Sequence, residues 1–107
     1  MKPEFEALPL VVNTDKKQFE MVVEGKTARI EYQQWDEKMA LTHTEVPREL
    51  EGRGIGSAII EKTLVYMDAN NLKLIPLCPM VIAYLEKHPE WKRILNINVK
   101  LKEASLD

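Results

Sequence analysis

The chain has 107 residues, 45% of them hydrophobic and 30% charged, as in a soluble protein with one modest core. Its net charge of −2 gives no support for binding nucleic acid or an anionic membrane. The single cysteine excludes an internal disulfide and a zinc site built on several cysteines. No segment reaches the roughly 20 apolar residues of a membrane span, and Glu4 and Glu6 do not suit a secretory signal. We therefore expect a cytoplasmic protein, acting as a monomer or weak dimer.

The first half of the chain has the period-two hydrophobic pattern of β-strands. The predicted strands are 10–12, 19–24, 27–32 and 39–46. Gly25 and Lys26 form the predicted turn of a hairpin, and a second turn is expected at 36–38. We therefore expect this half to be an all-strand, antiparallel meander.

In the second half the apolar residues change to helical spacing. Ile60, Leu64 and Met67 would share one face of a helix that begins near Ser57 and ends at 68–71. The remaining predicted elements are a strand at 72–77, a helix at 79–88 opened by Pro79, and a strand at 94–101. Within 72–77, Pro76 indicates an unpaired or bulged position. The expected fold is α+β: one domain spanning 1–107, with a mixed, mostly antiparallel sheet and two helices.

Three of the four glycines, Gly52, Gly54 and Gly56, alternate between a predicted strand and a predicted helix. Glycine allows close backbone approach there, and N–H groups at a helix N-terminus attract anions, to which Arg53 would add a positive charge. A merely flexible connection is the alternative. A Walker loop would need a following Gly-Lys-Ser/Thr, and a dinucleotide fingerprint needs a different spacing within a βαβ unit. The loop therefore predicts a phosphate site of another kind.

The segment from Val46 to Gly56 resembles motif A of the GNAT superfamily of N-acetyltransferases, with Glu51 in place of the usual Gln or Arg. Together with 43–47, 76–79 and 84–91, it is similar to a short, single-domain GNAT subfamily, over about two thirds of the chain. This resemblance implies a minimal acyl-CoA N-acyltransferase fold without part of the N-terminal helical region. It also implies acetyl-coenzyme A (acetyl-CoA) as cosubstrate and an unidentified amine as acceptor, joined by direct attack in a ternary complex.

The resemblance also implies which residues contact coenzyme A. They are Thr44, Val46, Glu51, Gly52, Arg53, Gly54, Ile55, Gly56, Ser57, Cys78, Pro79, Tyr84, Lys87 and His88. The N–H of Val46 is the candidate donor to the developing oxyanion. Lys87 and His88 would reach the coenzyme's phosphates, although solvated cations at a helix end are the more common explanation.

Four side chains are candidates for the chemistry. His43 and Glu45 would share one face of a strand, where either could accept the amine's proton or serve only a structural purpose. The resemblance implies that Tyr84 protonates the leaving thiolate, which is uphill by roughly 1.5 pKa units for an unperturbed phenol; the alternative is an amphipathic residue at a helix edge. Cys78, just before a helix, is either a nucleophile that carries the acetyl group or a small residue lining the groove.

Other functions stay open at this stage. The chain could be a CoA-binding module of the same fold without catalysis, or a domain that recognises a peptide, although a peptide has no use for an anion site. We expect no metal site, because a zinc deaminase would need two further cysteines. The acceptor is not identified by the sequence, and an open cleft would admit a polypeptide amine.

Overall fold

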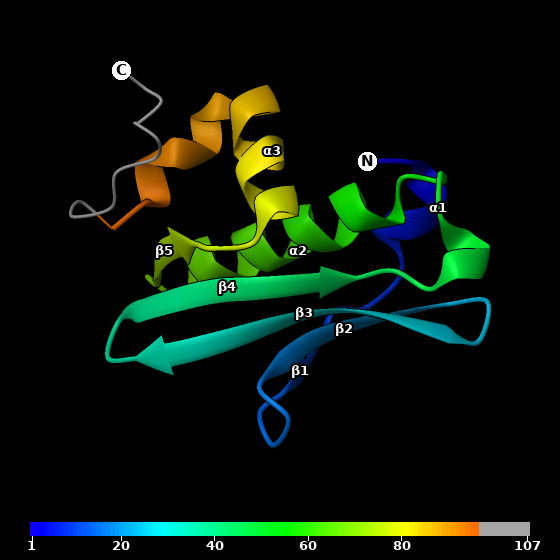
Figure 1. The fold of residues 1–107 in the computed structure, drawn as a ribbon, viewed down its shortest axis with the longest axis horizontal. Helices are drawn as coiled ribbons and strands as arrows, with labels where there is room; N and C mark the ends of the chain where they lie inside the picture. Colours follow the sequence, from blue (N-terminus) through cyan, green and yellow to red (C-terminus); the bar gives the residue numbers. More distant parts are fainter. Residues whose placement is uncertain (97–107) are drawn as a thin grey trace.

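A computed structural model describes residues 1–96, and these form one five-stranded sheet with two longer helices along one side of it (Figure 1). The strands are β1 (Val11–Asn13), β2 (Gln18–Val23), β3 (Lys26–Trp35), β4 (Lys38–Glu45) and β5 (Lys73–Pro76), in that order across the sheet. The helices are α1 (Pro3–Glu6), α2 (Ile55–Ala69) and α3 (Pro79–Lys87), with 3₁₀ turns η1 (Arg48–Leu50) and η2 (Pro89–Ile94). β1 to β4 pair antiparallel and β4 pairs parallel to β5, which confirms the α+β class.

The β2–β3 hairpin forms as predicted, but its turn lies one residue earlier than the predicted Gly25 and Lys26. Val23 lies opposite Lys26, and the two residues between them, Glu24 and Gly25, have positive φ angles of 52° and 78°. Two consecutive left-handed residues match the twist of the flanking strands, and a glycine adopts that conformation without strain. The tip of this hairpin is thereby held in a defined position, which matters for the glycine loop.

The core lies between the sheet and α2. Phe19 and Met21 of β2 and Ile30 of β3 are fully buried on the face that α2 covers. The stripe predicted on the helix is buried too, at Ile59, Ile60, Thr63, Leu64 and Met67. Burying a large aliphatic or aromatic side chain contributes about 1.5–3 kcal/mol, so this alternation fixes which face of each strand points inward.

A β-bulge in β4 sets the orientation of the candidate site residues. Tyr32 pairs with Leu41 while Glu31 pairs with His43, so Thr42 is an extra residue, and its hydroxyl donates to the Glu31 carbonyl at 3.1 Å. The extra residue shifts by one position the alternation of inward and outward side chains along β4. Leu41 and Thr44 therefore both point inward, while His43 is exposed.

The first half of the chain is not all strand, which corrects the sequence prediction. α1 forms one turn, with proline in its first turn and Phe5 only 2% exposed in the core. Four residues are too few to show a helical period, and the element depends on burial of Phe5. Most of the strand predicted at 94–101 lies outside the described residues. Its first part contributes the end of η2 and a single parallel bridge from Leu95 to Leu74.

The parallel pairing of β4 with β5 ends early. Pro76, expected to be unpaired or bulged, lies in register with Leu41 as the last residue of β5. The irregularity comes directly after it, because the N–H groups of Leu77 and Cys78 both donate to the Leu41 carbonyl, at 3.1 and 3.0 Å. β4 continues to Glu45 past this point. Within residues 1–96, no helix is long and apolar enough to cross a membrane.

Candidate functional site

The glycine loop leads directly into α2. Gly52 and Gly54 have positive φ angles of 82° and 86°, and Gly54 is the N-cap residue, so no side chain caps the helix. The first intrahelical bond runs from the Ala58 N–H to the Gly54 carbonyl at 3.1 Å, which leaves the preceding N–H groups without helical partners. The first turn holds no acidic residue. The end of this 15-residue helix therefore favours an anion.

Glycine at position 56 serves a different structural purpose from Gly52 and Gly54. Its φ angle is not in the left-handed region, but a Cβ atom there would lie 3.0 Å from Sδ of Met80 and 3.7 Å from Cγ2 of Val46. The absence of a side chain thus lets α3 and the end of β4 approach the first turn of α2.

Two adjoining cavities surround this helix end. The first, of about 310 Å³, is lined by Thr44, Glu45, Val46, Leu50, Glu51, Gly52, Gly54, Ile55, Gly56 and Met80. The second, of about 290 Å³, is lined by Gly54, Gly56, Ser57, Ile60, Met80, Ala83, Tyr84, Lys87 and His88. Three residues line both, so the cavities form adjacent parts of one groove between β4, α2 and α3. We call this the α2 groove.

Most of the residues predicted to contact coenzyme A line the α2 groove. Three of the predicted residues do not. Cys78 is buried, Pro79 lies at the surface outside both linings, and Arg53 lines a different cavity together with Glu24.

Arg53 points away from the groove and towards the β2–β3 hairpin. Its Nη1 and Nη2 donate to the two carboxylate oxygens of Glu24 at 3.1 and 2.6 Å. This hydrogen bonding lowers the pKa of Glu24 and raises the pKa of Arg53. The guanidinium therefore ties the glycine loop to the hairpin tip in this conformation.

Cys78 lies beneath the groove. It is the N-cap residue of α3 and is 4% exposed, and its Sγ is 3.3 Å from Oγ1 of Thr44, which is 8% exposed. The bulge in β4 points Thr44 inward and so makes this contact possible. The thiol is covered by the chain's own side chains.

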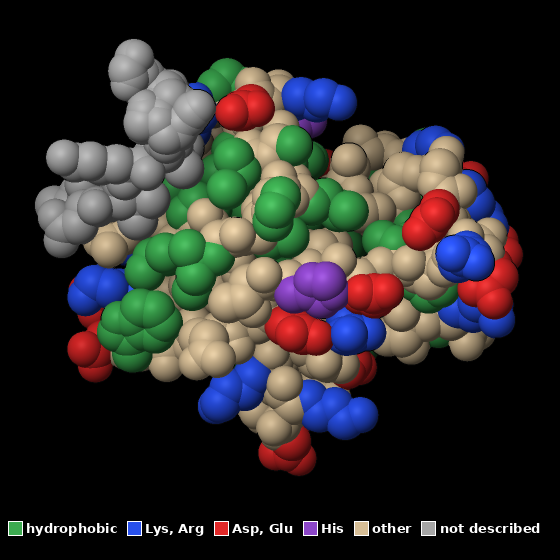
Figure 2. Space-filling model, viewed as in Figure 1, with side chains coloured by type: hydrophobic (Ala, Val, Ile, Leu, Met, Phe, Trp, Pro, Cys, Tyr) green, Lys and Arg blue, Asp and Glu red, His purple; other side chains and the backbone are tan. Residues whose placement is uncertain are grey.

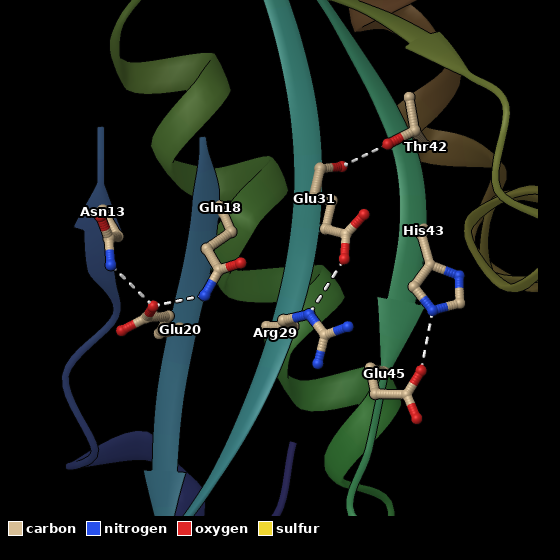
Figure 3. A network of polar contacts seen from close by, with 8 residues as sticks. All are labelled: Asn13, Gln18, Glu20, Arg29, Glu31, Thr42, His43 and Glu45. Carbon is tan, nitrogen blue, oxygen red and sulfur yellow. Dashed lines mark hydrogen bonds and ion pairs between the residues drawn. The ribbon is translucent and has the colours of Figure 1, made fainter. Parts of the chain in front are cut away.

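His43 and Glu45 share the outer face of β4, as predicted, with Nε2 of His43 2.8 Å from Oε1 of Glu45 (Figure 3). Both side chains are about half exposed, and Arg29 pairs with Glu31 at 3.0 Å on the neighbouring strand. Glu45 also lines the first cavity, because it is the last residue of β4. A residue that lines the groove thus has its carboxylate hydrogen-bonded to an imidazole on the outer face of the sheet.

Tyr84 lies on the wall of the second cavity and is only 7% exposed. Its ring stacks on His88, with ring centroids 4.3 Å apart and planes inclined by 27°. Burial, followed by the negative charge and hydrogen bonding of Glu61, raises the pKa of Tyr84 to about 12. The phenol is therefore neutral at physiological pH, and its single proton would have to turn from Glu61 towards a ligand to serve as a hydrogen-bond donor there.

Comparison with known proteins identifies the family of this chain and a solved structure with a similar fold. The sequence model of the family described as GCN5-related N-acetyl-transferase matches residues 18–94. The chain belongs to this GNAT family. The fold is also similar to the NMR solution structure of a GCN5-like proposed N-acetyltransferase from Staphylococcus aureus, with 26% sequence identity and a TM-score of 0.63 over 85% of this chain and 90% of that one. A search of curated proteins gave no match.

Several residues that line the α2 groove were not predicted from the sequence. Met80 and Ala83 of α3 line it beside Tyr84 and Lys87. These four positions have the spacing i, i+3, i+4 and i+7, which places them on one helical face, so the pattern around Tyr84 could have identified Met80. Leu50 and Ile60 also line the groove but belong to the core, where sequence alone does not separate lining from packing.

Proposed function

We propose that this GNAT protein transfers an acetyl group from acetyl-CoA to an amine, by direct attack within a ternary complex. The observation that carries the proposal is the α2 groove, in which an uncapped helix N-terminus meets the free end of β4. Anion binding at the helix and backbone contact along the strand are what a long ligand with a pyrophosphate and a thioester arm requires.

The pyrophosphate would bind at the glycine loop. Backbone N–H groups of Gly52, Gly54, Gly56 and Ser57 are the proposed donors, assisted by the positive end of the helix dipole. Glu51 and Ile55 border the same cavity. Lys87 and His88 line the second cavity and are proposed to contact the phosphate group of coenzyme A that lies outside the pyrophosphate.

The acetyl end would lie beside the last residues of β4. Thr44 and Val46 border the first cavity, where β5 no longer pairs with β4. We propose that the Val46 N–H donates to the carbonyl oxygen as negative charge develops on it. A preorganised donor of this kind contributes roughly 10²–10³ in rate.

The amine must lose a proton before or during its attack on the thioester carbon. Glu45 is the proposed acceptor because this residue lines the cavity, and His43 would hold its carboxylate through their 2.8 Å hydrogen bond or take the proton onward. The new C–N bond forms as the π pair of the carbonyl moves to oxygen, and the C–S bond breaks when the carbonyl re-forms. The electron pair of the C–S bond leaves with the thiolate.

Tyr84 and Cys78 have different proposed roles. Tyr84 would donate a hydrogen bond to the leaving sulfur, since its raised pKa disfavours complete proton transfer. Cys78 is covered and contacts Thr44, which favours a packing role beneath the acetyl end and supports direct attack over an acetyl-cysteine intermediate. Pro79 starts α3 and holds this helix end in place.

A CoA-binding module without catalysis is the second candidate. It is favoured by the same raised pKa of Tyr84, because a phenol near 12 is a poor acid for a thiolate. The two candidates differ in turnover and agree in ligand binding.

The distinguishing experiment measures release of free thiol from acetyl-CoA with a panel of amines that includes small polyamines and lysine-containing peptides. Transferase activity predicts release above the amine-free blank, together with an acetylated amine detected by mass spectrometry. Glu45→Gln is the matched variant and is expected to bind CoA but turn over slowly. Tight binding without release for any amine would favour the binding module. Absence of CoA binding would refute both candidates.

A further inference from the structure

A lysine far away in sequence lies against the glycine loop. Nζ of Lys2 donates to the carbonyl oxygen of Arg53 at 2.9 Å, across a separation of 51 residues. Its Cε lies 3.8 Å from the position that a Cβ atom on Gly54 would occupy. Gly54 lines both cavities of the α2 groove, so Lys2, which itself lines neither cavity, contacts the loop at the border of the proposed pyrophosphate site.

A docked element holds Lys2 in this place. Lys2 is the N-cap residue of α1, whose Phe5 is buried in the core, and the ammonium lies 5.9 Å from the centre of the Phe5 ring. At the other end of α1, Nζ of Lys62 from α2 donates to the Glu6 carbonyl at 3.2 Å. The lysine is therefore positioned before any ligand arrives, which lowers the entropy lost on binding.

The two cations beside the glycine loop, Arg53 and Lys2, differ in the groups that they contact. Both ends of the Arg53 guanidinium are engaged by the Glu24 carboxylate. Figure 2 shows acidic and basic side chains intermixed at the end of the molecule where the hairpin and α1 lie. Among residues 1–96, Lys2 takes part in no ion pair within 4.0 Å, and its one hydrogen bond is to a neutral carbonyl. Two ammonium protons remain for another acceptor.

We propose that Lys2 is a phosphate-binding residue of the α2 groove, which makes α1 part of the cofactor site. This inference rests on the proposed function. The ammonium keeps its bond to the Arg53 carbonyl and donates a second one to a pyrophosphate oxygen, while Arg53 stays paired with Glu24 and positions the loop. Lys2, the N-cap residue of α1, is thus the cation that contacts the pyrophosphate at the glycine loop.

The test measures the dissociation constant of CoA by titration calorimetry for the wild type and three variants. Lys2→Ala is expected to bind about five-fold more weakly, the effect of one exposed charge contact. Lys2→Arg should bind within about two-fold of the wild type. Lys62→Ala is the matched control, because it removes a similar lysine-to-carbonyl bond between α1 and α2, and its affinity should not change. The loss for Lys2→Ala should shrink as salt is raised.

Each contrary result has a distinct meaning. Equal affinity of Lys2→Ala and the wild type would overturn the role of Lys2 and leave the proposed function standing. An equal loss of CoA affinity in Lys62→Ala would show that binding depends on the docking of α1 and not on a phosphate contact. That result would also overturn the role of Lys2. A wild-type protein that does not bind CoA would overturn both the inference and the proposed function.

Discussion

Replacing Tyr84 by phenylalanine separates two roles that a tyrosine beside a leaving thiolate could have. The phenol pKa of about 12 lies roughly 3.5 units above that of an ordinary thiol near 8.5, so complete proton transfer is uphill by about 5 kcal/mol. The unperturbed side chains would differ by only roughly 1.5 units. The structure therefore favours a hydrogen bond over proton transfer.

The expected loss follows from that distinction. A hydrogen bond contributes about 0.5–1.5 kcal/mol net, so Tyr84→Phe should lower kcat by roughly two- to ten-fold. General acid catalysis would instead contribute roughly 10²–10⁴. The phenylalanine ring keeps the stacking on His88 and the burial of the site, so the variant removes only the hydroxyl and its interaction with Glu61.

The assay is thiol release at saturating acetyl-CoA, measured from about pH 6 to pH 10 for both proteins. Parallel pH profiles are expected in this range, since Tyr84 stays protonated throughout. A hundred-fold loss, or an alkaline limb below pH 10 that disappears in the variant, would refute the reasoning about Tyr84.

Three further predictions concern stability and the covalent alternative. Thr63→Val should raise the free energy of unfolding by about 1 kcal/mol in urea titrations, because the buried Thr63 hydroxyl has no hydrogen-bond partner among residues 1–96; a loss would contradict this. Cys78→Ala should keep thiol release within about three-fold of the wild type, whereas loss of turnover in a folded variant would restore the acetyl-cysteine route. The pKa of Tyr84 is higher in the folded protein than in the unfolded chain, so its contribution to stability is present below about pH 10 and is lost towards about pH 12. In Tyr84→Phe the melting temperature should therefore depend less on pH between about pH 10 and pH 12.

The sequence predicted the parts of the fold that depend on local periodicity. Alternation at Phe19 and Met21 placed β2, helical spacing at Ile60 and Leu64 placed the buried face of α2, and the turn at Gly25 followed from glycine's conformational freedom. Each of these signals lies within a few residues of the element it defines. α1 was missed because its single turn depends on burial of Phe5 against distant residues.

The glycine loop was recognisable from three residues, but the directions of the side chains around it were not. Arg53 pairs with Glu24, 29 residues earlier, and the carbonyl of Arg53 accepts from Lys2. The inward position of Thr44 depends on a one-residue bulge in β4. Such contacts depend on strand register and tertiary packing, which local patterns do not encode.

The central claim is that the N-terminus of α2 holds the phosphates of coenzyme A. The most direct measurement is amide chemical-shift mapping of the ¹⁵N-labelled protein during titration with CoA. Phosphate binding at this helix end predicts saturable shifts that are largest at Gly52, Gly54, Gly56 and Ser57. Absence of shifts at millimolar CoA, or shifts confined to the separate cavity beside Leu8 and Val23, would contradict it.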